Sequence, residues 1–263
     1  MKLLGVEIGA PPTERGQLAR LLERNAQLRD VFAHDAVLAQ RLAQLQRWQA
    51  QRLMRSHADL HGHPRYRLAT EFFFRELYAA GNVRQRDSDL IRVQSAMERL
   101  LPREGLVALC LAIELETLSQ ELDADTVRGL PAGPVTVARY ADAYRAAGRA
   151  ADRIRQVELM GQVGAYLDGV VHKPIVRGLV KLARRPAHAA GFGLLQEFLE
   201  RGLVAFEAMH GAREFLQTLR TRELRASRRL FDGAPDPFEF GPDDISSAGP
   251  AHTERSTNRA KPG

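Results

Sequence analysis

The sequence predicts an all-α protein, a single bundle-like domain of about nine or ten helices with a disordered C-terminal tail. Up to about residue 231, apolar residues recur every three or four positions, as on the buried face of a helix. No segment alternates apolar and polar residues with a period of two, so we expect no sheet. Residues 70–86 include three successive phenylalanines, Phe72 to Phe74, and are apolar nearly all round, which is typical of a central helix that its neighbours bury.

Breaks in this pattern divide the first half of the chain into helices. A long amphipathic helix is expected from about Asp35 to His57, and the run from His61 to Pro64 interrupts it. The phenylalanine-rich helix then ends near Gly81, a favourable C-terminal residue. Other helices are expected over residues 13–30, 87–101 and 104–127.

The second half begins after the clearest internal linker, residues 129–134, which is rich in glycine and proline. Thr136 is expected to cap the next helix, and another follows from about residue 149 to 171. Pro174 and Pro186 each fit the first turn of a helix, where a missing N–H has no intrahelical partner. The last helix is expected over residues 212–231.

We therefore divide the chain into a flexible N-terminus (1–12), a helical domain (13–231) and a disordered tail (232–263) rich in Gly, Pro and Ser. Phe238 and Phe240 are expected to pack back onto the helices. Two subdomains that meet at the linker are the alternative, but wide apolar faces in both halves favour a single domain.

Composition limits the classes of function. The formal net charge is +6, the pI is near 9.9, and arginine supplies most of the positive charge. The single cysteine, Cys110, excludes an internal disulfide and suits a reducing compartment. No apolar run in the sequence is long enough to predict a transmembrane helix. Glu7 interrupts the apolar N-terminal residues too early for a secretory signal peptide. We expect a cytoplasmic protein.

Basic residues gather around the helix that Pro174 begins. A helix N-terminus with cationic side chains favours an anion, so this segment is a candidate site for a phosphate or an acidic ligand. Nucleic acid is a further candidate partner, although no aromatic residues interleave with these charges. The candidate anion-binding residues are His172, Lys173, Arg177, Arg184 and Arg185.

Carboxylates on apolar helices are candidate acids or bases. Glu76 and Glu114 lie on segments with little polar surface, where burial would raise a carboxyl pKa. The alternative is that each is paired with an arginine. Glu71, Arg75 and Tyr78, on the phenylalanine-rich helix, are further candidate functional residues.

Metal binding has one candidate pair. Glu207 and His210 have the Glu-x-x-His spacing that points both side chains the same way from one helix. A di-iron site needs a second such pair, and no other histidine has an acid three residues before it. The cluster His57, His61 and His63 lacks the glutamate of a zincin motif. We expect no cofactor.

Residues 72–78 closely resemble the signature of the FFLEELY motif proteins, a bacterial family. Phe74 and Arg75 depart from that signature, and the other five residues match it. Residues 118–123, 140–145 and 191–202 look like the same family, so the resemblance covers roughly residues 64–232. It implies an all-helical fold and carries no catalytic residue, cofactor or partner.

The leading functional hypothesis is a non-enzymatic interaction or ligand-binding protein, because no convergent catalytic set is found. The first alternative is a helical-bundle enzyme, with or without a metal. The second alternative is a protein whose basic surface binds nucleic acid or another anion.

Overall fold

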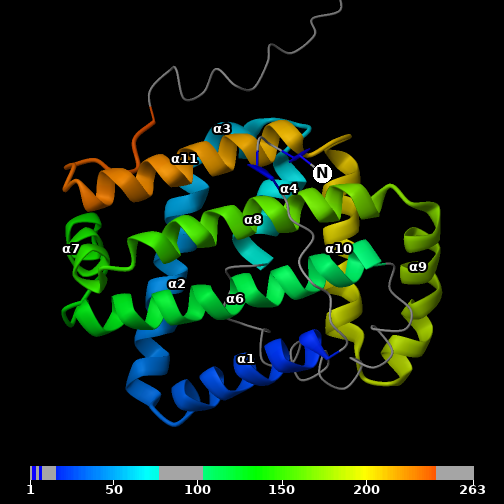
Figure 1. Cartoon of the computed structure of the whole chain (residues 1–263), viewed down its shortest axis with the longest axis horizontal. Coiled ribbons are helices and arrows are strands. Elements are labelled where there is room, and N and C mark those ends of the chain that lie inside the picture. Colours follow the sequence, from blue (N-terminus) through cyan, green and yellow to red (C-terminus); the bar gives the residue numbers. More distant parts are fainter. Residues whose placement is uncertain (1, 4–5, 8–15, 77–102, 241–263) are drawn as a thin grey trace, which may run out of the picture.

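The computed structural model describes residues 2–3, 6–7, 16–76 and 103–240 (Figure 1). The predicted all-α class is confirmed, with ten α-helices and one π-helical segment, η1, in this part of the chain. Of the predicted tail (232–263), residues 241–263 lie outside the described residues, as does most of the predicted N-terminal segment. Residues 232–240 are described, and the expected packing is confirmed: Phe238 lies against Trp48 and Tyr140, and Phe240 lies against His57. The elements are α1 (Gln17–Ala33), α2 (Ala36–Ser56), α3 (Ala58–Gly62), α4 (Arg67–Glu71), η1 (Phe72–Glu76), α6 (Arg103–Gly129), α7 (Val137–Ala147), α8 (Ala150–Val171), α9 (Pro174–Ala189), α10 (Gly193–Ala208) and α11 (Arg213–Phe231).

The expectation of no sheet needs one small correction. Strands β1 (Lys2–Leu3) and β2 (Val6–Glu7) pair antiparallel, with Lys2 opposite Glu7 and Leu3 opposite Val6. A ladder of two residues a side is too short to produce a visible alternation of apolar and polar residues, which is why the pattern missed it.

Helices α1, α6, α8 and α11 lie side by side, and α2 crosses them (Figure 1). Helix α7 closes one end of this layer, and α9 and α10 form the other end. Asp35 caps α2 by accepting from the N–H of Leu38, and Thr136 caps α7 by accepting from that of Arg139. None of the helices in the described ranges is long and apolar enough to cross a membrane.

The three phenylalanines lie in the core. Phe72, Phe73 and Phe74 are 7%, 3% and 1% exposed. Regular helical steps would turn one of three successive side chains away from the other two, and the wider π-helical turn of η1 keeps all three inside. Phe73 packs between Phe206 and Phe215, with ring centroids 5.7 and 5.5 Å away. The predicted interior packing is thus confirmed for these rings, while Tyr78 lies outside the described residues.

Helices on both sides of the linker 129–134 share apolar cores. Leu45 of α2 belongs to the same cluster as Tyr140 and Leu230, and Leu53 belongs to the same cluster as Phe215. The division into one or two domains stays a prediction.

The two prolines of the second half behave differently. Pro174 occupies the first turn of α9, as predicted. Pro186 does not begin a helix and instead lies inside the last turns of α9, with the N–H of Ala190 bonded to its carbonyl. The break comes later, at Gly191, whose φ of +83° suits the left-handed turn that ends a helix.

Candidate functional site

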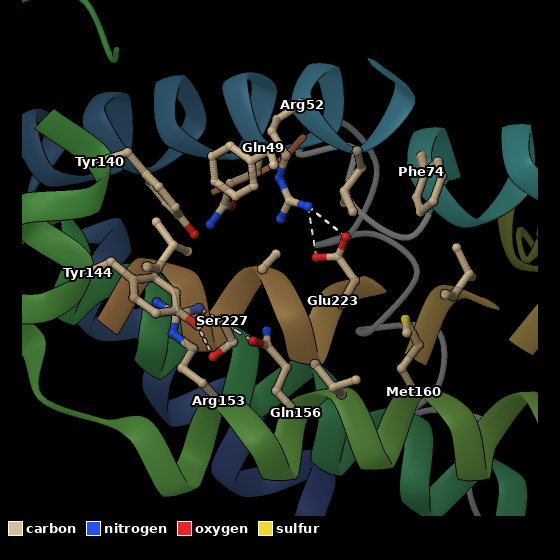
Figure 2. A pocket seen from close by; sticks show the side chains of 16 residues that line it. Gln49, Arg52, Phe74, Tyr140, Tyr144, Arg153, Gln156, Met160, Glu223 and Ser227 are labelled. Atoms are coloured by element: carbon tan, nitrogen blue, oxygen red, sulfur yellow. Dashed lines mark hydrogen bonds and ion pairs between the residues drawn. The ribbon is translucent and has the colours of Figure 1, made fainter. Parts of the chain in front are cut away.

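A small chamber lined by both polar and apolar side chains, called the polar chamber below for its charged groups, lies between α2, α7, α8 and α11 (Figure 2). Its volume is about 50 Å³. At ~10–15 Å³ a molecule, that is room for about three to five waters or one small ion. The lining side chains are those of Gln49, Arg52, Leu53, Phe74, Tyr140, Tyr144, Arg153, Gln156, Val157, Met160, Leu219, Glu223, Ala226, Ser227, Leu230 and Phe238.

Glu223 of α11 is held by two partners at one side of the chamber. Nη1 of Arg52 lies 2.7 Å from both of its carboxylate oxygens, and Nε2 of His57 lies 2.9 Å from Oε1 (Figure 2 shows the Arg52 contacts). Burial alone would raise the pKa of Glu223, but the charge of Arg52 and the hydrogen bond from His57 lower it to about 2. Glu223 is therefore ionised at neutral pH.

His57 is fully buried behind this pair. Its burial lowers its pKa, against the opposing effect of Glu223, so the imidazole is neutral. When Nε2 donates to Glu223, Nδ1 is left to accept from Arg222, whose Nη1 lies 3.4 Å away. Arg222 in turn makes a two-pronged ion pair with Asp59, at 2.8 and 2.9 Å.

Arg153 of α8 lies at the other side and is only 5% exposed. Its Nη2 donates to Oγ1 of Thr126 at 2.8 Å and to the carbonyl of Leu122 at 3.2 Å. Its Nη1 donates to Gln156, and its guanidinium lies 4.4 Å from the ring centroid of Tyr144. Within the described ranges, no carboxylate lies within ion-pair distance of Arg153.

Two further polar side chains, those of Asp123 and Gln49, contribute to the Arg153 side of the chamber. The carboxyl of Asp123 accepts from Gln49 at 3.0 Å and from Gln46 at 3.3 Å. Burial raises the pKa of Asp123, and the charge of Arg153 opposes that rise through space. Oε1 of Gln49 is buried with no hydrogen-bond partner among the described atoms. A buried guanidinium and an open amide oxygen therefore border the same space.

Two titratable groups of the chamber are poorly suited to proton transfer at neutral pH. The hydroxyl of Tyr144 bonds to that of Ser227 at 2.8 Å, and burial raises the pKa of Tyr144 to about 12. It stays protonated at neutral pH and is no base. Glu223, with a pKa near 2, holds its proton too weakly to act as an acid.

The family model for DUF8198, a domain of unknown function, matches residues 28–237. The chain belongs to this family. The matched residues contain every residue that lines the chamber except Phe238. No curated protein and no solved structure matches the chain.

In this DUF8198 member the two predicted carboxylates that the structure describes, Glu71 and Glu114, contact different partners. Glu71 is partly exposed, 3.1 Å from Nε2 of His61, and Arg75 is exposed. Glu114 is also partly exposed and lies 2.7 Å from Arg155, so the arginine pairing, weighed as the alternative, is what the structure has. The side chain of Glu76 lies outside the described residues, as does Tyr78.

The five candidate anion-binding residues lie on or beside α9 and do not form one site. Four of them are each near a different acid: His172 near Asp168 (3.5 Å), Lys173 near Glu104 (3.4 Å), Arg177 near Glu207 (3.5 Å) and Arg184 near Glu200 (3.7 Å). Arg185 is exposed.

The candidate metal pair does not share a helix. Helix α10 ends at Ala208, so Glu207 is in its last turn, whereas His210 lies beyond it with a φ of +49°. The Glu-x-x-His geometry needs an unbroken helix through both residues. Across the described ranges, no three His, Cys, Asp or Glu side chains converge as a metal site would require.

The chamber residues were missed at the sequence level. The sequence signal that could have found them is a polar residue on the otherwise apolar face of a predicted helix. Gln49 and Arg52 lie on the apolar face of α2, and Arg153 lies on that of α8. The pattern alone does not show that these faces meet.

Proposed function

We propose that this protein is a non-enzymatic binding protein that holds a small anion in the polar chamber beside Arg153. The observation that supports it is the buried guanidinium of Arg153, which has no carboxylate at ion-pair distance in the described part of the chain. Buried charges in proteins are normally paired, because an unpaired ion away from water is costly. Arg52 and Arg222, the other buried arginines in the described ranges, each have a carboxylate partner.

The size and polarity of the chamber define the ligand class. About 50 Å³ admits an anion of no more than about four non-hydrogen atoms, such as formate, acetate or nitrate. The guanidinium of Arg153 supplies the positive charge, and its Nη1, which donates once to Gln156, has a second hydrogen to donate to an anion oxygen.

Other parts of the proposal rest on the sequence. The resemblance of residues 72–78 to the FFLEELY motif proteins supports a bacterial origin and membership of that family. The single cysteine supports a cytoplasmic location.

The test compares anions at constant ionic strength and pH. We expect sodium formate, acetate or nitrate to raise the melting temperature relative to sodium gluconate, whose anion is too large for the chamber. The shift should saturate with concentration. It should vanish in Arg153→Met, which removes the charge but retains a similar apolar stem.

Arg155→Met is the matched control, because Arg155 lies two residues away on α8 and pairs with Glu114 at the surface. We expect it to keep the anion response. Arg153→Met breaks no ion pair, and Oγ1 of Thr126 still donates to the carbonyl of Leu122, so the variant should remain folded by circular dichroism. If none of the three anions stabilises the protein, or if Arg153→Met responds as wild type does, the proposal is wrong.

A further inference from the structure

Helix α9 lies at one end of the molecule (Figure 1). It presents an apolar ridge to solvent. No residue of this 16-residue helix is buried. Ile175, Leu179 and Leu182 are 65%, 36% and 76% exposed. Together with the exposed Pro186 they follow one another at steps of four, three and four residues, so they lie along one side of the helix. We call these four residues the α9 ridge.

The polar side of the same helix is entirely basic. It carries Lys173, Arg177, Lys181, Arg184 and Arg185, and the sequence has no acid from residue 172 to 196. Lys173, Arg177 and Arg184 face acids of α6 and α10 in exposed ion pairs, which contribute little stability. Lys181 and Arg185 are exposed. On an ideal helix Arg185 projects about 60° from Leu182, so it flanks the ridge.

The shape and charge of this surface narrow the possible occupants. A second copy of the chain would bring its own Lys181 and Arg185 against the same two basic residues, so like-charge repulsion disfavours it. A partner helix normally lies in a groove, whereas side chains exposed by 65% and 76% stand out as a ridge. Because α9 lies at one end of the molecule, it can contact a flat surface without a steric clash between that surface and the other helices.

We infer that the α9 ridge rests on an anionic lipid surface, with Ile175, Leu179 and Leu182 in the headgroup region. Lys181 and Arg185 face the lipid phosphates and carboxylates. An apolar stripe beside a Lys/Arg-rich face, with low overall hydrophobicity, is the pattern of helices that lie in the membrane interface. Basic residues near an anionic leaflet add electrostatic attraction. This inference is independent of the anion proposed for the chamber.

The test is co-sedimentation of the full chain with vesicles of phosphatidylcholine alone or with about 30% phosphatidylserine. We expect binding only to the second kind, and a fall in binding as sodium chloride is raised. Leu182→Asp should lower the partition coefficient by about tenfold or more, and Arg185→Glu should lower it too. Val37→Asp is the matched control, because Val37 is 67% exposed at the start of α2, and it should bind as wild type does.

A second measurement locates the contact. The only native cysteine, Cys110, is buried, so Leu182→Cys can carry an environment-sensitive fluorophore, with wild type as the labelling control. We expect its emission to shift to the blue with the anionic vesicles, while the same label on Val37→Cys stays unchanged. The inference fails if the protein does not bind these vesicles, if Leu182→Asp and Val37→Asp bind equally well, or if the label does not react with the free Leu182→Cys variant.

Discussion

Nε2 of His57 lies 2.9 Å from Oε1 of Glu223, across 166 residues of sequence. The contact joins the end of α2 to the middle of α11 and lies behind the wall of the chamber that Glu223 forms. It holds a neutral imidazole against an ionised carboxylate, because burial lowers the pKa of His57 while Arg52 helps to lower that of Glu223.

This pair predicts a loss of stability on mild acidification. Below an ordinary histidine pKa of 6.5, the unfolded chain protonates His57 while the folded chain does not. The free energy of unfolding therefore falls as the pH falls from about 6.5, by at most about 1.4 kcal/mol per pH unit for this one proton. Glu223 adds a second fall, which begins near its ordinary pKa of 4.5 and is complete at about 2. Urea unfolding at a series of pH values measures both.

His57→Gln separates the two effects. A glutamine amide can still donate to Glu223 but does not titrate, so the fall between pH 6.5 and 5 should become shallower than in wild type. An equal slope in the variant would mean that other groups are responsible for it.

Removal of a core ring should be severe. Phe73→Ala leaves a cavity between Phe206 and Phe215, and we expect a loss of about 3–5 kcal/mol in the free energy of unfolding. The measurement is urea unfolding. A loss below about 1 kcal/mol would show that the ring is not packed as described.

Two helical glycines, Gly202 and Gly169, differ in the room that the structure leaves for an added Cβ. A Cβ on Gly202 of α10 would lie 2.8 Å from Cζ of Phe72, a rigid ring atom, so Gly202→Ala should destabilise the protein by about 1–3 kcal/mol. A Cβ on Gly169 of α8 would meet nothing within 4 Å, so Gly169→Ala should stabilise the helix by about 0.5–1 kcal/mol. Thermal unfolding of both variants gives the comparison. If they shift the melting temperature equally, α10 does not approach η1 this closely.

The fold was largely predictable from the sequence because its signals are local. The limits of α2 follow from a cap at Asp35 and a steady apolar stripe, and those of α7 follow from Thr136 and Gly148. The π-helical turn of η1 was not predictable, because it depends on tertiary contacts that bury three successive rings. Pro186 was misplaced because a proline near a helix end resembles one at a helix start.

The candidate site was not predictable for a different reason. Glu114 lies on a helix that is apolar on several sides, but a single surface arginine, Arg155, accounts for it. The chamber instead depends on long-range pairs such as Arg52 with Glu223, 171 residues apart. Helical periodicity shows which face of each helix is buried, but it does not show which helices pack their buried faces against one another.

Phe238 should act as the outer wall of the chamber. Its ring centroid lies 4.6 Å from Cζ of Arg52 and 6.1 Å from the centroid of Trp48, the only tryptophan. Phe238→Ala removes that cover, so we expect Trp48 emission to shift to the red and acrylamide to quench it more strongly. The lost ring contacts should also lower stability by about 1–2 kcal/mol.

Phe240→Ala is the control for this prediction, because Phe240 does not pack near Trp48. Its ring centroid lies 5.9 Å from that of His57, and Arg222 lies over the same ring. Its Trp48 spectrum should match that of wild type. If Phe238→Ala also leaves the spectrum unchanged, residues 232–240 do not cover the chamber in solution. If only Phe238→Ala changes the Trp48 spectrum, residues 232–240 are part of the folded domain and not of the disordered tail. They then limit the access of solvent to Arg52 and to the space beside Arg153.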